Sequence, residues 1–215
     1  LRLMLAKNRH EMDRIVREDY SRRKETNAVD IGVRTVLVVG YGRIGTRVAK
    51  LCATFGMNVL IHDTKFTGAE SKIDGCEVVH DIDEGLSRAH ILTVHIPLTN
   101  QTASLFGYDK LRMMPAGSYV INCARGGIID ESAIRDLTQS GHLAGAAFDV
   151  YSREPTWPDH PILEAKNTLL SAHTAAFTTE GLARMASQAA QNICDHFNGT
   201  LSEDNIYKLE AFSGN

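Results

Sequence analysis

The sequence is poor in the features that mark membrane proteins and folds stabilised by disulfides or metals. No apolar run in its 215 residues approaches the roughly 20 residues that a membrane-spanning helix needs. The cysteines are few and scattered, without a C-x-x-C pair, at Cys52, Cys76, Cys123 and Cys194. This pattern argues against a disulfide framework or zinc site and favours a reducing, cytoplasmic setting in which each cysteine is a small buried residue. The histidines show no metal-ligand spacing such as H-x-x-x-H, so we expect no bound metal.

The charge is too balanced to indicate a nucleic-acid or membrane partner. The formal net charge is −3, which gives no general attraction to a phosphate backbone or an anionic lipid surface. The basic run at residues 22–24 contains no aromatic residue, so a solvated linker is favoured over a nucleic-acid patch. Hydrophobic and charged contents of 43% and 23% are those of an ordinary globular protein. We therefore expect neither nucleic acid nor a membrane as partner.

A glycine-rich turn between a predicted strand and a predicted helix is the most informative stretch. Residues 36–39 are apolar β-formers, residues 40–45 read G-Y-G-R-I-G, and an apolar helical pattern follows. A second apolar strand at 59–61 leads to Asp63. A bare G-x-G-x-x-G is a weak signal, but a strand before it, a helix after it and an acid beyond the next strand are the context of a dinucleotide-binding turn.

Each part of this turn has a physical task. Gly40 permits the tight turn, Gly42 removes the side chain where a pyrophosphate approaches the backbone, and Gly45 lets the helix pack close to the strand. The helix N-terminus offers unpaired N–H groups and a partial positive charge to the phosphates. Asp63 accepts hydrogen bonds from ribose hydroxyls and would repel a 2′-phosphate, which favours NAD over NADP.

Beyond the turn, strand and helix patterns alternate without an internal repeat. This predicts an α/β fold with a doubly wound parallel sheet, covered by helices on both faces. Further strands are expected at residues 77–79, 91–95, 119–123, 144–148 and 168–171, and helices near 82–88, 108–113, 130–139 and 179–197. The apolar face of the first helix is expected to consist of Ile44, Val48, Leu51, Cys52 and Phe55.

The chain is expected to divide into three segments. Residues 1–30 form an N-terminal helix and linker, residues 31–199 form one dinucleotide-binding domain that includes the C-terminal helix, and residues 200–215 form a tail. The helical pattern at the start rests on the apolar residues Leu1, Leu5, Met12 and Val16.

Reactive side chains follow the ends of several predicted strands, where open α/β sheets bind their ligands. Hydride transfer to a carbonyl group leaves an alkoxide that needs a proton donor, and His173 follows the last predicted strand. Glu154 is suited to hold the other ring nitrogen of that histidine. Arg125, between an apolar strand and two glycines, is suited to clamp a substrate carboxylate.

Simpler interpretations of these residues stay open at this stage. An arginine in a loop is often only a solvated surface residue. Glu154, beside Pro155, could serve only to shape a turn. His173 and His95 each follow an apolar strand and could be packed in the core.

The motifs that carry these residues resemble the D-isomer-specific 2-hydroxyacid dehydrogenase family, most strongly its D-3-phosphoglycerate dehydrogenase-like branch. They read V-V-G-Y-G-R-I-G at 38–45, H-I-P-L-T at 95–99, I-N-C-A-R-G-G-I-I-D at 121–130, L-A-G-A-A-F-D-V at 143–150, E-P at 154–155 and S-A-H-T at 171–174. The resemblance covers nearly the whole chain. It implies a Rossmann NAD-binding domain, NAD as cofactor, a homodimer and a 2-oxo or 2-hydroxy acid substrate.

The resemblance also implies individual roles. Arg125 would bind the substrate carboxylate, Glu154 would hold His173, and His173 would be the acid/base. The residues implied in cofactor binding are Gly40, Gly42, Arg43, Ile44, Gly45, Asp63, His95, Pro97, Thr102, Ala124 and Asp149. Asp149 and the backbone near Ala124 would position the nicotinamide carboxamide, and Pro97 and Thr102 would line the cofactor pocket. The segment 1–18 resembles the helix that crosses the family's dimer interface.

The sequence departs from the family pattern in three places. Ala172 stands where family members usually carry proline before the histidine. Formate dehydrogenases of the family usually have glutamine at the position of Glu154, which disfavours formate. Nothing corresponds to the family's N-terminal flavodoxin-like substrate domain, so we expect a piece of a longer protein with little activity by itself.

Two functions fit this resemblance. The first is an NAD-dependent dehydrogenase that interconverts 2-oxo acids and D-2-hydroxy acids of the phosphoglycerate, hydroxypyruvate or glyoxylate type. The alternative is an NAD(H)-sensing corepressor-like binding protein, because such relatives keep the same fold and the same trio of residues.

Overall fold

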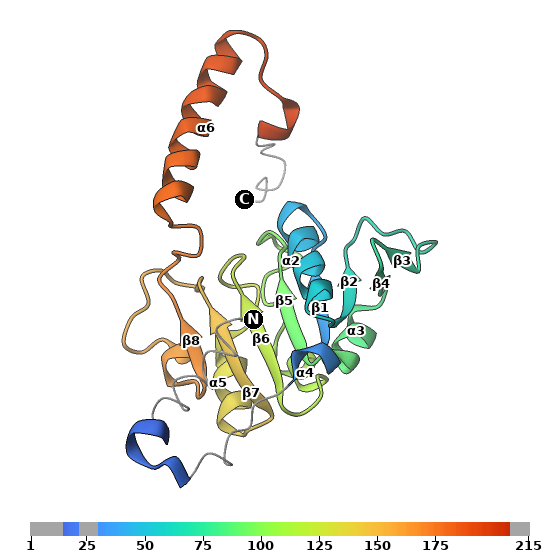
Figure 1. The fold of residues 1–215 in the computed structure, drawn as a ribbon, viewed down its shortest axis with the longest axis vertical. Coiled ribbons are helices and arrows are strands. Elements are labelled where there is room, and N and C mark those ends of the chain that lie inside the picture. Colours follow the sequence, from blue (N-terminus) through green and yellow to red (C-terminus); the bar gives the residue numbers. More distant parts are fainter. Residues whose placement is uncertain (1–14, 22–29, 207–215) are drawn as a thin grey trace. The chain divides into compact units, whose positions relative to one another are not determined.

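The computed structural model describes residues 15–21 and 30–206 (Figure 1). The chain forms two compact units, the first ending at Ser171 and the second beginning at Ala172. Residues 15–18 form a helical turn, and the rest of the helix expected at 1–18 lies outside the described residues. In the described part of the chain, no helix has the length and apolar character needed to span a bilayer.

The first unit is built on one sheet, whose strand order is β3-β4-β2-β1-β5-β6-β7-β8. The strands are β1 (Thr35–Val39), β2 (Asn58–His62), β3 (Lys72–Ile73), β4 (Cys76–Val78), β5 (Ile91–Val94), β6 (Ser118–Asn122), β7 (Leu143–Phe148) and β8 (Thr168–Leu170). The helices of this unit are α2 (Arg43–Thr54), α3 (Ile82–Arg88), α4 (Tyr108–Arg112) and α5 (Glu131–Gln139). All strand pairs except β3–β4 are parallel, which confirms the predicted doubly wound fold.

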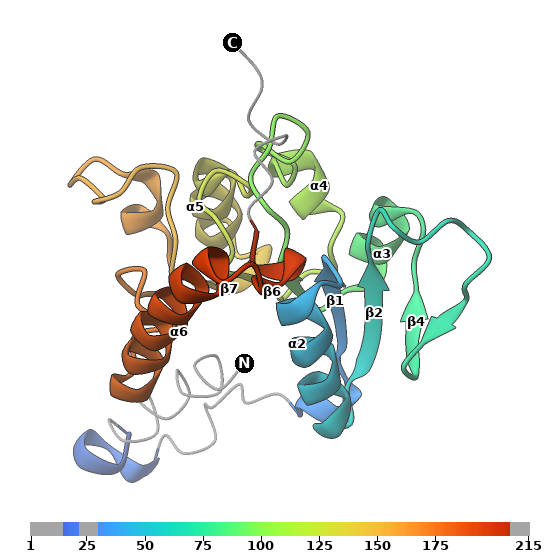
Figure 2. The ribbon, with the colours of Figure 1, turned by 90° about the horizontal axis from the view of Figure 1, so that it is seen from above.

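The sheet is buried on both faces, and side chains alternate between two cores along β1. Leu37 and Val39 belong to the core that α3, α4 and α5 cover. Val36 and Val38 belong to the core that α2 covers. Figure 2 shows α2 on one face of the sheet and α3, α4 and α5 on the other. Parallel strands that are buried on both faces are continuous apolar runs in the sequence. The positions of these strands could therefore be predicted from the sequence.

Strand β3 was missed in the sequence. It pairs antiparallel with β4, with Lys72 opposite Glu77 and Ile73 opposite Cys76. Asp74 and Gly75 join the two strands with positive φ angles of 50° and 81°. An Asp-Gly pair is typical of such a tight hairpin turn, but two residues are too few to show a strand periodicity.

The predicted packing face of α2 is only partly correct. Cys52 is buried and Val48 is half-buried against the core, but Ile44, Leu51 and Phe55 are 65%, 61% and 53% exposed. The other buried residues of the helix are the small Gly45 and Ala49. An added Cβ on Gly45 would lie 1.8 Å from Gly40 O, so the first turn of the helix approaches the glycine turn too closely for a larger residue.

The cysteines are free thiols, as expected, but only two of the four are buried. Cys52 and Cys76 are buried, whereas Cys123 and Cys194 are exposed. The expectation of burial was wrong for these two. Cys123 lies in the loop after β6, and Cys194 lies on α6 of the second unit.

The second unit contains α6 (Thr179–Phe197), which confirms the predicted long final helix. Thr178 caps it, because its hydroxyl accepts the N–H of Gly181 at 2.9 Å. The large apolar side chains of the helix are all exposed: Leu182, Met185, Ile193 and Phe197.

Candidate active site

The glycine turn lies where the order of the strands reverses. From β1 the chain builds the sheet toward β2 and β4, and then returns to add β5, β6, β7 and β8 on the other side. Open α/β sheets bind ligands at such a switch point, outside the carboxyl ends of the strands. The turn after β1 and the loop after β5 are in close backbone contact here. An added Cβ on Gly40 would lie only 2.5 Å from His95 O. Gly40 also has a φ of 92°, which favours glycine.

Of the three glycines in this turn, Gly42 is the one whose place in the folded chain an alanine could also take. It caps α2 with an ordinary φ of −84°, and an added Cβ would meet no atom within 4 Å. Gly40 and Gly45 are glycines because protein backbone crowds them, but the open space beside Gly42 leads to the unpaired N–H groups at the start of α2. A cradle of this kind fits a pyrophosphate.

Asp63 fastens the turn to the end of β2. Its Oδ2 accepts the N–H of Tyr41 at 2.6 Å, and its Oδ1 accepts the N–H of Lys65 at 3.0 Å. A carboxylate has about four acceptor positions, so positions are left for the predicted hydrogen bonds to ribose hydroxyls. The structure adds a second role that the motif did not show, which is to brace the glycine turn.

A cluster of cations lines the pocket beside this turn. Arg43 was predicted here, and the structure adds Arg47, Lys50 and Lys65 to the same lining. Lys65 Nζ donates to Tyr41 O at 2.5 Å and lies 5.4 Å from the centroid of the Tyr41 ring. These cations suit a phosphate-bearing ligand. Ile44, also predicted to bind cofactor, is exposed on α2 and does not line this pocket.

His95 is a half-buried residue at the end of β5. Its N–H donates to Val39 O at 2.7 Å, and its Nε2 lies 3.1 Å from Thr93 Oγ1. Burial lowers the pKa of His95 to about 4, so the ring is neutral near pH 7. A neutral ring beside the switch point is suited to hydrogen bonding, while its charged form would be costly there.

Pro97 and Thr102 belong to one short loop. Thr102 Oγ1 donates to Pro97 O at 2.6 Å and accepts the N–H of Thr99 at 2.8 Å. The hydroxyl of Thr102 therefore fixes the shape of the loop after β5. Its predicted place in a cofactor pocket stays a prediction.

The loop after β6 is held by Asn122, which is fully buried. Its Oδ1 accepts the N–H of Ala124 at 3.0 Å, and its Nδ2 donates to Arg125 O at 2.9 Å. The Arg125 guanidinium donates to Ala124 O at 2.6 Å. Asn122 stood in the motif, but no role was assigned to it. A polar residue in the last position of an apolar strand was the available signal.

The loop after β7 carries Asp149 and Glu154. Asp149 is 3% exposed, and its Oδ1 accepts the hydroxyl of Ser171, at the end of β8, at 2.6 Å. Glu154 Oε1 accepts the N–H of Tyr151 at 2.9 Å. The Tyr151 hydroxyl donates to Ser171 O at 2.7 Å, so one loop is tied to the ends of two strands. Tyr151 was not identified from the sequence.

The loops that bear Arg125 and Glu154 touch each other. An added Cβ on Gly126 would lie 1.8 Å from Tyr151 O and 2.5 Å from Ser152 N. The structure therefore brings the glycine turn, His95, the Arg125 loop and the Glu154 loop to one edge of the sheet.

His173 is the second residue of the second unit, so the predicted trio is divided between the two units. It is exposed and has a φ of 54°, in the left-handed region that non-glycine residues seldom adopt. Strain of this kind is concentrated at functional sites. The pairing of His173 with Glu154 stays a prediction.

In the described part of the chain, no group of three or more His, Cys, Asp or Glu side chains is arranged to hold a metal ion. The fold and the glycine turn together define a Rossmann dinucleotide-binding domain. Residues 1–175 match the model of the NAD binding domain of the D-isomer specific 2-hydroxyacid dehydrogenases. The chain belongs to the D-isomer-specific 2-hydroxyacid dehydrogenase family, and its cofactor is NAD.

The curated relatives of this chain include proteins named D-3-phosphoglycerate dehydrogenase and proteins named glyoxylate reductase. A D-3-phosphoglycerate dehydrogenase of Archaeoglobus fulgidus is 37% identical over 199 residues, which are 92% of this chain and 38% of that protein. A glyoxylate reductase of Aeropyrum pernix is 36% identical over 165 residues, which are 77% of this chain and 49% of that protein. The chain thus spans less than half the length of these relatives.

Solved structures with the same fold contain the cofactor. An NAD-dependent formate dehydrogenase from Staphylococcus aureus, in complex with NAD, has a TM-score of 0.81 and 29% identity, and the match covers 94% of this chain and 60% of that one. A D-lactate dehydrogenase from Aquifex aeolicus, complexed with NAD and lactic acid, has a TM-score of 0.78 and 28% identity, with 90% and 62% covered.

The two glycines Gly42 and Gly45 offer a matched pair of alanine substitutions. Gly45→Ala forces a Cβ against Gly40 O and is expected to cost about 1–3 kcal/mol of unfolding free energy. Gly42→Ala meets no protein atom and is expected to change stability by less than about 1 kcal/mol. It is nevertheless expected to weaken NADH binding by about tenfold or more. Urea unfolding and NADH fluorescence titration measure both effects, and unchanged NADH affinity of Gly42→Ala would contradict the pyrophosphate cradle.

The lowered pKa of His95 predicts that the stability of the fold depends on pH. Burial lowers its pKa from the ordinary value of 6.5 to about 4, so between these pH values the unfolded chain binds a proton that the folded chain does not. Stability is expected to fall as pH drops from 6.5 toward 4. His95→Gln removes this contribution and is expected to flatten the slope by up to about 3 kcal/mol over the window. Urea unfolding at several pH values measures it, with exposed His80→Gln as the control; parallel slopes for His95→Gln and wild type would refute the assignment.

Proposed function

We propose that the full-length protein containing this chain is an NAD-dependent dehydrogenase that interconverts a 2-oxo acid and a D-2-hydroxy acid. The observation that supports it most directly is the contact between the Arg125 loop and the Glu154 loop, at the same edge of the sheet as the glycine turn. A carboxylate-binding guanidinium and a histidine-holding carboxylate thus end at the same edge of the sheet. The names of the relatives agree with this chemistry.

The proposed mechanism assigns one task to each residue. When bound, NADH supplies the hydride that reduces the carbonyl carbon of the substrate. Arg125 holds the substrate carboxylate through charge-assisted hydrogen bonds. His173 donates a proton to the oxygen of the carbonyl group as that oxygen gains negative charge. Glu154 holds the other ring nitrogen of His173 and fixes its orientation.

The substrate class rests on the same residues. Arg125 selects for a carboxylate beside the carbonyl group, which suits phosphoglycerate-, hydroxypyruvate- and glyoxylate-type acids alike. Relatives named as D-3-phosphoglycerate dehydrogenases and as glyoxylate reductases both match the chain. We propose that the choice among these acids is made by residues outside this chain. The corepressor-like alternative gains no support from the relatives reported above, which are named for enzymes.

We also propose a homodimer in a cytoplasmic setting. The free thiols of Cys52, Cys76, Cys123 and Cys194 support a reducing compartment. The exposed apolar side chains of Ile44, Leu51 and Phe55 on α2 support a second copy, because neighbouring large apolar side chains on a surface are typical of an interface. Sedimentation equilibrium is expected to find dimers of the wild type and monomers of Leu51→Glu. A monomeric wild type would refute the dimer.

Removing the proposed proton donor is expected to separate catalysis from binding. In the full-length protein, His173→Ala is expected to lower turnover of 2-oxo acids with NADH on the order of 10²- to 10⁴-fold. NADH affinity is expected to stay within about twofold, because the nucleotide contacts lie in the first unit. Steady-state kinetics and NADH fluorescence titration measure the two effects.

A matched control lies in the same unit as His173. His196 is exposed on α6, and His196→Ala is expected to leave both turnover and NADH affinity unchanged. Unchanged turnover in His173→Ala would sink the assignment of the acid/base and, with it, the proposed mechanism.

A further inference from the structure

We propose that Glu131 is a positioning residue that locks the Arg125 loop against the Glu154 loop. This inference rests on the function proposed above and adds a residue to its machinery. Glu131 lies in the first turn of α5 and contacts neither NAD nor substrate in the mechanism above. It acts through Ser152, a residue of the Glu154 loop whose backbone contacts the Arg125 loop.

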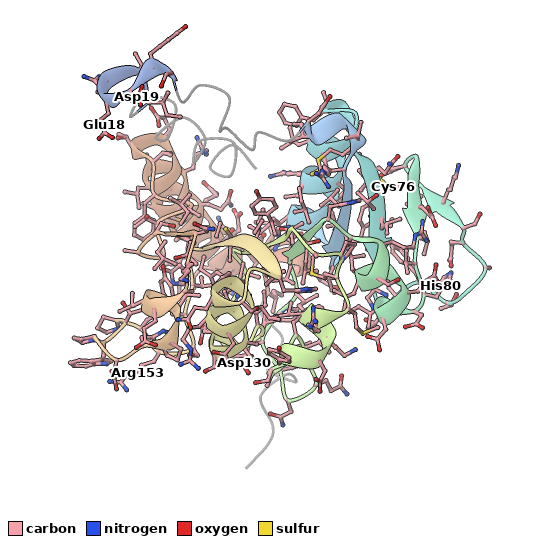
Figure 3. The ribbon with its side chains drawn as sticks, turned by 90° about the horizontal axis from the view of Figure 1, so that it is seen from below. Glu18, Asp19, Cys76, His80, Asp130 and Arg153 are labelled. Atoms are coloured by element: carbon pink, nitrogen blue, oxygen red, sulfur yellow. The ribbon has the colours of Figure 1, made fainter. Side chains whose placement is uncertain are left out.

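The contact between Glu131 and Ser152 uses both carboxylate oxygens. Oε1 accepts the backbone N–H of Ser152 at 2.8 Å, and Oε2 accepts its hydroxyl at 2.5 Å. Figure 3 labels the next residues along the chain, Asp130 before Glu131 and Arg153 after Ser152. Two charge-assisted hydrogen bonds to one residue fix both its backbone and its side chain.

Ser152 transmits this restraint to Glu154. The preceding residue, Tyr151, donates its N–H to Glu154 Oε1 at 2.9 Å. The backbone on both sides of Tyr151 is thus held. Glu131 accepts the N–H of the peptide that links Tyr151 to Ser152, and the Glu154 carboxylate accepts the N–H of the peptide before it. Any shift of Ser152 would move the donor that orients Glu154.

The same peptide also fixes the loop that bears Arg125. An added Cβ on Gly126 would lie 1.8 Å from Tyr151 O, 1.9 Å from its carbonyl carbon and 2.5 Å from Ser152 N. The backbone beside Arg125 is therefore in direct contact with the peptide that Glu131 holds. One anchored peptide sets the position of both loops.

Glu131 is not required for capping its own helix. Asp130 is the N-cap of α5, and its side chain accepts the N–H of Ser132 at 2.9 Å. The Glu131 carboxylate turns instead to the neighbouring loop, although it is only 6% exposed. A buried carboxylate is costly unless it is well paired, and the two hydrogen bonds to Ser152 offset that cost here.

His160 packs beside the Glu131 carboxylate. It is 6% exposed, with Nε2 at 3.8 Å from Glu131 Oε2 and 3.4 Å from Ser152 Oγ. Its ring meets the Tyr151 ring edge to face, with centroids 6.0 Å apart. The buried Glu131 and His160 side chains thus pack together beside Ser152, which is itself exposed.

The test compares Glu131→Ala and Glu131→Gln in the full-length protein with a panel of 2-oxo acids and NADH. Glu131→Ala is expected to lower kcat on the order of 10- to 100-fold, because misplaced groups lose that much reactivity. NADH affinity is expected to stay within about twofold. Glu131→Gln keeps one acceptor for the Ser152 N–H and is expected to recover part of the lost kcat.

A second measurement does not depend on activity. Hydrogen exchange of the Tyr151 and Ser152 amides is expected to be faster in Glu131→Ala than in wild type, because opening of the loop exposes them. Glu164→Gln is the control, since Glu164 is exposed on the 3-10 helix at 161–164 and contacts neither loop. It is expected to change neither kcat nor exchange.

The outcomes separate this inference from the function on which it rests. An active wild type with Glu131→Ala kinetics or amide exchange like those of wild type would overturn the positioning role alone. Loss of stability with kcat unchanged would also overturn it, because a purely structural residue behaves in that way. A wild type that reduces no 2-oxo acid would overturn the proposed function and this inference together.

Discussion

The arrangement of the site depends on the close approach of α2 to the turn that precedes it. An added Cβ on Gly45 would lie 1.8 Å from Gly40 O, so helix and turn are in backbone contact. The helix then packs through Ala49 and Cys52, and its N-terminus is fixed at the reversal between β1 and β5. The loops after β5, β6 and β7 follow in order along the same edge, each in contact with an adjacent loop or strand end.

Most of the fold could be predicted from the sequence, because strands that are buried on both faces are continuous apolar runs in the sequence. The packing face of α2 could be predicted only in part. Val48 and Cys52 pack against the core as expected, but Ile44, Leu51 and Phe55, with the same helical spacing, are exposed. The spacing does not show how near the helix lies to the sheet, and here the small residues Gly45 and Ala49 lie at the contact. The hairpin of β3 was missed for a different reason, since its signal is the turn at Asp74 and Gly75 and not a periodicity.

The residues to which the proposed site assigns a chemical role were predicted because reactive groups follow strand ends. The residues that hold them were not. Asn122, Tyr151 and Glu131 act through hydrogen bonds between backbone and side chain across loops, and these depend on the conformation of each loop. Asn122 had a signal in its position at the end of an apolar strand. Glu131 resembled any acid in the first turn of a helix, which is a common and usually local feature.

Asp63 braces the glycine turn in addition to its predicted contact with the ribose, and this has a consequence for redesigning the protein's choice of nucleotide. Exchanging this acid for a neutral residue is the obvious first step toward accepting a 2′-phosphate, and Arg43, Arg47 and Lys65 already supply cations nearby. The same exchange would remove the acceptor of the Tyr41 N–H and loosen the glycine turn. A successful redesign therefore needs a neutral acceptor of similar length, such as asparagine, so that nucleotide choice changes while the turn remains fastened.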